Sequence, residues 1–120
     1  MYKISINSIY RYENNEIEKI EKDYLANLLD DTYISDEIDL RFGKNFIEVI
    51  GKKNAYYIKR YELDKITRAR LEVNSNLLET KIKTNKFKEN NGVYMILASE
   101  YTTDNDKILD VKINIKIKEI

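Results

Sequence analysis

Apolar and polar residues alternate along most of this 120-residue chain, with the period of two that a strand with one buried face requires. The clearest case is 108–118, where Val111, Ile113 and Ile115 alternate with lysine and asparagine. The pattern therefore predicts a protein built mainly of strands. The other expected strands cover 2–12, 32–42, 46–50, 55–61, 67–73, 77–87 and 93–101.

Short turn-like sequences separate these expected strands. All three glycines, Gly43, Gly51 and Gly92, lie between apolar runs. Asn91-Gly92 is the strongest hairpin signal in the chain, because a type I′ turn needs positive φ at both central residues. Consecutive strands joined by short turns predict an antiparallel meander.

One segment departs from the alternation. Residues 16–29 have helical spacing of their apolar positions, and Asn14 or Asn15 precedes them as a candidate helix cap. We therefore expect a short helix over 16–29. The apolar positions of this segment are Ile17, Ile20, Tyr24, Leu25, Leu28 and Leu29.

Long strands twist and leave unpaired edges, and closing the sheet removes those edges. We expect one domain, 1–120, of the all-β class bordering on α+β: a small antiparallel barrel with the helix packed on it or plugging one end. The alternative is an open, curved sheet with the helix across one face.

Composition excludes several kinds of site. The chain has no cysteine and no histidine, so disulfides, thiolate metal sites and histidine-based catalysis are excluded. The carboxylate pairs lack an EF-hand pattern, and no glycine-rich phosphate loop or nucleophile motif is present. We therefore expect a protein that is not an enzyme and has no cofactor and no metal. No signal peptide and no apolar run of ~20 residues is found, so we expect a cytoplasmic protein without a membrane partner.

The last third of the chain adds a resemblance. Four features of this region follow one another in the order seen in the YwiB-like family. They are residues 82–85 (IKTN), Gly92, the polar loop TTDNDK and the alternating strand 108–118. Residues 77–118 resemble the C-terminal part of that family, a set of small bacterial proteins of unknown function with a lipocalin-like (calycin-like) antiparallel barrel. The resemblance implies a barrel and carries no assigned activity.

Two polar residues fall on strand faces that are otherwise apolar. Arg60 shares a face with Tyr56 and Ile58, and Glu100 shares one with Ile96 and Ala98. If these faces point inward, both residues need partners, either each other or a ligand. Our first hypothesis is a barrel that binds a small molecule or peptide inside, through Tyr57, Arg60, Tyr61 and Glu100. In the alternative register these faces lie outside, and Met95, Leu97 and Tyr101 form the core side.

The second hypothesis concerns the segment 55–73, in which aromatic and basic residues alternate on neighbouring strands. Such surfaces bind nucleic acid or protein. The balanced charge, 21 basic against 21 acidic residues, argues against nucleic acid, and an ordinary amphipathic hairpin also explains the pattern. The residues of this interaction surface are Tyr57, Lys59, Tyr61, Arg68 and Arg70.

Overall fold

The computed structural model describes all residues 1–120 and contains ten antiparallel strands and no helix. No element of the structure is a helix that could span a membrane. The strands are β1 (Tyr2–Tyr12), β2 (Ile17–Leu29), β3 (Thr32–Ile34), β4 (Ile38–Gly43), β5 (Phe46–Gly51), β6 (Tyr56–Glu62), β7 (Ile66–Val73), β8 (Asn76–Asn90), β9 (Val93–Tyr101) and β10 (Lys107–Glu119).

The sheet closes on itself. Each strand from β2 to β9 pairs with the next one along the chain, and β1 pairs with both β2 and β10. A closed barrel, predicted from the need to remove sheet edges, is thereby confirmed, with ten strands.

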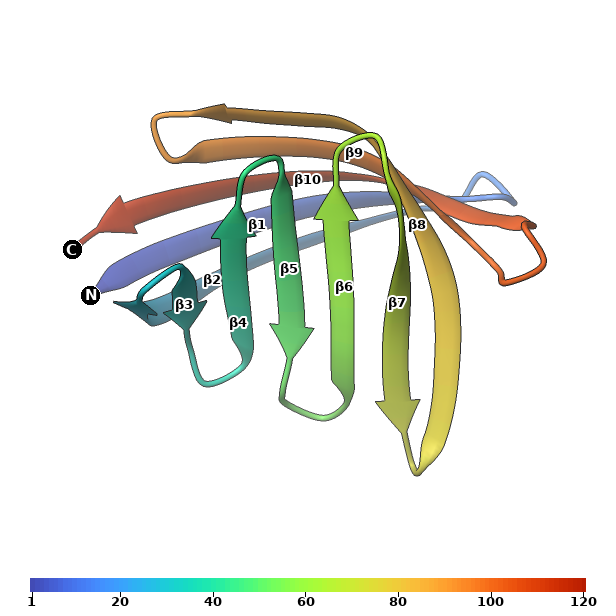
Figure 1. The fold of residues 1–120 in the computed structure, drawn as a ribbon, viewed down its shortest axis with the longest axis horizontal. Helices are drawn as coiled ribbons and strands as arrows, with labels where there is room; N and C mark the ends of the chain where they lie inside the picture. The colour runs from blue at the N-terminus through green and yellow to red at the C-terminus, as the bar shows by residue number, and fades with distance from the viewer.

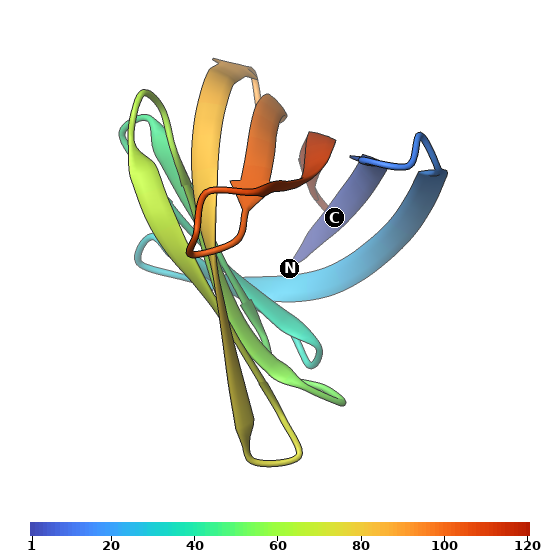
Figure 2. The same cartoon turned by 90° about the vertical axis from the view of Figure 1, so that its right-hand side faces the viewer.

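The long and short strands cross at a steep angle (Figure 1). β1, β2, β9 and β10 run along the length of the molecule, whereas β4 to β7 run across it, and Figure 2 shows both sets curving around one interior. β8 takes part in both sets. Its register shifts between Thr84 and Lys86, and a bulge of this kind bends a strand.

The helix predicted over 16–29 is wrong, because this segment forms β2. β2 pairs with β1 from Ile17 to Ala26, and its hydrogen bonds supply the partners that β1 would otherwise lack. The helical spacing arises because β2 carries apolar residues on both faces. Tyr24 points inward, whereas Leu25 and Leu29 lie on the solvent side with exposed fractions of 59% and 62%.

The expected strand 32–42 is divided into β3 and β4. Ser35 follows β3 directly, and its hydroxyl donates to the carbonyl of Ile38 and accepts a hydrogen bond from the Ile38 amide. The hydroxyl thus stabilises a tight turn that the polar sequence SDE marks.

The turns depend on asparagine and aspartate. Asn91 and Gly92 have φ values of 50° and 78°, which confirms the predicted hairpin turn. Other turns use Asn, Asp or Ser at positive φ, a conformation that Asn and Asp tolerate better than most residues. This use of asparagine explains how a chain with three glycines forms so many turns.

The interior is filled mainly by aliphatic side chains from the inner faces of most strands. Ile4, Leu40, Ile47, Ile82, Ile96 and Ile115 are fully buried. Edge-to-face and tilted contacts join aromatic rings at the end of the barrel where β1 and β9 begin. The rings are those of Tyr2, Tyr33, Phe42, Phe87 and Tyr94.

Candidate ligand-binding cavity

The barrel encloses a cavity of about 350 Å³ beside this packed core. Thirteen of its sixteen lining residues are hydrophobic, so most of the wall is apolar. Ile20 and Lys22 line the cavity from β2 and are also exposed to solvent, so the cavity reaches the surface there. Its isoleucines come from six strands and include Ile6, Ile20, Ile38, Ile47, Ile96, Ile113 and Ile115.

β6 supplies the polar part of the wall. Tyr57, Lys59 and Tyr61 all point inward, because every second residue of a strand lies on the same face. Tyr10 from β1 and Tyr24 from β2 add two more phenol groups. The cavity is therefore an apolar chamber with the ammonium groups of Lys22 and Lys59 and several phenol hydroxyls on its wall.

Lys59 forms an ion pair with Glu100 inside the barrel. The Nζ of Lys59 donates to the Oε1 of Glu100 at 2.8 Å, and Glu100 is only 5% exposed. Burial opposes the charge on Lys59, but the charge and the hydrogen bond of Glu100 outweigh that effect and raise the lysine pKa above its ordinary value. Lys59 therefore remains an ammonium group within an apolar chamber.

The phenol groups of Tyr24, Tyr57 and Tyr61 on the cavity wall stay protonated at neutral pH. Tyr61 is 2% exposed, and burial, together with the negative charge of Glu100, raises its pKa well above the usual range. Burial also raises the pKa of Tyr57 and of Tyr24. These hydroxyls are thus available as hydrogen-bond donors.

A small polar hollow adjoins the cavity and shares Lys22, Tyr24, Ile38 and Tyr57 with it. Glu37 accepts hydrogen bonds from Lys22 at 3.0 Å and from Lys53 at 3.2 Å. These two bonds lower the pKa of Glu37, and the Glu37 carboxylate raises the pKa of Lys22. Lys22, Glu37 and Lys53 thus form a charged rim beside the cavity. The sequence did not indicate this rim, because the three residues come from separate parts of the chain.

Three of the four residues predicted to contact an internal ligand lie in the interior. Tyr57 and Tyr61 line the cavity, and Glu100 lies behind Lys59. Arg60 points outward, because its neighbours Lys59 and Tyr61 point inward. Arg60 therefore does not pair with Glu100. The partner of Glu100 is Lys59, which the second hypothesis had assigned to the interaction surface of residues 55–73.

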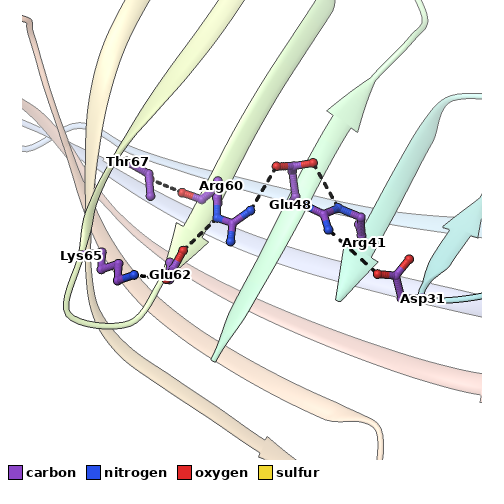
Figure 3. Close-up of polar contacts among 7 residues, drawn as sticks. All are labelled: Asp31, Arg41, Glu48, Arg60, Glu62, Lys65 and Thr67. Carbon is purple, nitrogen blue, oxygen red and sulfur yellow. Dashed lines mark hydrogen bonds and ion pairs between the residues drawn. The ribbon is translucent and has the colours of Figure 1, made fainter. Parts of the chain in front are cut away.

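On the outside, Arg60 belongs to a row of alternating charges that crosses the three strands β4, β5 and β6 (Figure 3). Its guanidinium bonds to Glu62 at 2.9 Å, lies 3.6 Å from Glu48 and stacks on Phe46, with 3.9 Å from the guanidinium carbon to the ring centroid. The row also contains Asp31, Arg41 and Lys65. Each charge in it has an opposite neighbour, as in an ordinary solvated sheet face.

The alternative interaction surface is divided between the two faces of the sheet. Arg68 and Arg70 lie outside and both pair with Glu79 of β8, at 3.6 Å and 3.3 Å. Lys59 and the two tyrosines of β6 lie inside. The basic and aromatic residues of 55–73 therefore do not form one exterior surface.

The fold and the cavity together define a closed antiparallel barrel with a hollow interior. No family model matches the chain, and no curated protein is similar to it in sequence. Among solved structures the fold is similar to that of the YwiB protein from Bacillus subtilis, with a TM-score of 0.67 over 98% of this chain and 92% of that chain, at 11% sequence identity. This similarity supports a YwiB-like fold.

Proposed function

We propose that this protein is a non-catalytic binding protein that holds a small, mainly apolar molecule inside its barrel. The supporting observation is the cavity of about 350 Å³, a size within the range of small-molecule sites. An apolar wall with a few polar groups is also the usual composition of such sites.

The architecture supports the same proposal. Barrel diameter grows with strand number, and about eight strands already give an interior that side chains can just fill. Ten strands leave more room, and the isoleucines of this chain do not fill it. Lipocalin-like barrels, the class suggested by the sequence resemblance, hold ligands in this position.

Binding of the uncharged fluorophore N-phenyl-1-naphthylamine tests the proposal. Its fluorescence rises in apolar surroundings, so we expect a saturable increase with one site per chain. Ser8→Phe adds a ring to the cavity wall, where Ser8 is 7% exposed, and is expected to weaken binding by about tenfold or more. Asn7→Phe is the matched control, because the neighbouring side chain is exposed on the other face of β1.

Circular dichroism is used to check that both variants retain the sheet. An unsaturable signal in the unmodified protein contradicts the proposal, and so does equal weakening by both substitutions.

A further inference from the structure

We propose that the ligand of this cavity carries a carboxylate or similar anionic end that binds the ammonium of Lys59, and that Glu100 is the counter-ion of this ammonium when no ligand is bound. The inference rests on the proposed function and specifies the chemistry of its ligand.

The first argument is the set of polar groups on the wall. The charged lining residues are Lys22 and Lys59, and the others with polar atoms are one serine and four tyrosines. No carboxylate or amide side chain lines the cavity. A cationic ligand would find no counter-ion on this wall, whereas an anionic ligand would find two ammonium groups and several phenol donors.

The second argument is the free hydrogen-bonding capacity of Lys59. An ammonium carries three N–H donors, and the only hydrogen bond of the Lys59 ammonium is the one to Glu100. The Lys59 side chain is 28% exposed and forms part of the cavity wall. Two donors therefore remain for acceptor atoms inside the cavity. Lys22, by contrast, is engaged with Glu37 at the rim.

The third argument is the cost of the ion pair. Removing two charges from water can cost more free energy than their attraction returns, and an apolar pair of similar size is often at least as stable. Ile96 and Ala98 occupy the inner face of β9 next to Glu100, so an apolar residue would suit the fold at this position. The pair is better explained by a need for a charged lysine on the cavity wall.

Glu100 is the group that keeps this lysine charged. A lysine in apolar surroundings tends to lose its proton unless a negative group lies close to it. Glu100 keeps Lys59 protonated, and a ligand carboxylate can take over or share this role because it reaches the same ammonium from the cavity side. The ligand class that fits is a small amphiphile with one anionic end and an apolar body against the isoleucines.

Octanoate and 1-octanol form the probe pair, because they share one chain length and differ in charge. Competition with the fluorophore at about pH 7 and constant salt is expected to show octanoate binding about tenfold more tightly. Glu100→Gln removes the competing carboxylate. The carboxylate of octanoate then becomes the group that keeps Lys59 protonated, so the preference is expected to increase. Lys59→Met combined with Glu100→Gln removes both charges and is expected to abolish the preference while 1-octanol still binds.

Lys65→Met is the matched control, because Lys65 is a lysine outside the barrel with a 68% exposed side chain, and it should leave the preference unchanged. Equal binding of the two probes, or a preference retained by the double variant, overturns the inference and leaves the proposed function standing. If the double variant does not fold, a preference that falls in Glu100→Gln at about pH 6 as well, where the lysine without Glu100 is more fully protonated, overturns the inference. Failure of the fluorophore and both probes to bind overturns the proposed function itself.

Discussion

Lys59 and Glu100 are 41 positions apart in the sequence, and β6 and β9 are not paired in the sheet, so the two residues meet across the interior. Alternation along β9 was enough to mark Glu100 as a polar residue on an apolar face. It could not identify the partner, because the inward face of β6 is fixed by pairing with β5 and β7. The same limit explains why Arg60 was expected inside.

The first prediction concerns the energy of this pair. Lys59→Met leaves Glu100 in the interior without a counter-ion, and a broken buried pair costs about 3 kcal/mol. Adding Glu100→Gln removes the lone charge, so the double variant is expected to be more stable than Lys59→Met alone. Urea unfolding followed by circular dichroism measures both values. If the second substitution lowers stability further, the two side chains are not coupled as the 2.8 Å contact indicates.

At the scale of the elements, the period of two predicted most strands well, including 108–118, which lies within β10 (Lys107–Glu119). It failed for β2, where leucines on the exposed face imitate helical spacing. β2 pairs with β1 along nearly the whole length of β1, and this backbone pairing stabilises the strand. Local sequence patterns do not contain that information. The division between β3 and β4 depends on hydrogen bonds of Ser35 and was missed for a similar reason.

The second prediction concerns the end of β5, where the ring of Tyr57 lies across Gly51, its partner on β6. A Cβ at position 51 would overlap this ring, so Gly51→Ala must displace Tyr57 on the cavity wall. Overpacking of this kind costs about 1–3 kcal/mol. We expect lower stability together with weaker binding of the fluorophore.

Gly43→Ala is the control for this prediction. The ring of Phe46 covers Gly43 in the same way, but this pair lies on the outer face beside Arg41 and Arg60. The control should lose stability and keep its affinity for the fluorophore. A loss of affinity in both variants would indicate that the effect of Gly51→Ala is not local to the cavity.

At the scale of the whole molecule, the sequence predicted closure of the sheet and suggested a ligand inside it, but it did not give the size or the lining of the cavity. Strand number and stagger determine the width of a barrel, and neither follows from alternation. The inner residues that fill one end include several packed aromatic rings, whereas isoleucines from different strands are the commonest residues around the cavity. Whether such side chains meet or leave a space is decided by strand curvature, to which the bulge in β8 contributes.

The third prediction follows from the tyrosines that this closed shape buries. Burial raises the pKa of Tyr61 well above the ordinary range and also raises the pKa of Tyr57. An unfolded chain releases these phenol protons near about pH 10, while the folded barrel retains them. Above that pH the folded state binds more protons than the unfolded state, so the free energy of unfolding falls as pH rises. The raised pKa of Lys59 acts in the same direction.

Urea midpoints between about pH 8 and pH 11 measure this decline, because tyrosine and lysine titrate in and just above that range. Tyr61→Phe removes the most strongly shifted phenol and should make the decline shallower. Tyr56→Phe changes a tyrosine of the same strand that is 46% exposed and points away from the cavity, so its profile should follow that of the unmodified protein. A decline that Tyr61→Phe leaves unchanged would mean that the Tyr61 hydroxyl ionises as readily in the barrel as in water, which is incompatible with a closed interior around β6.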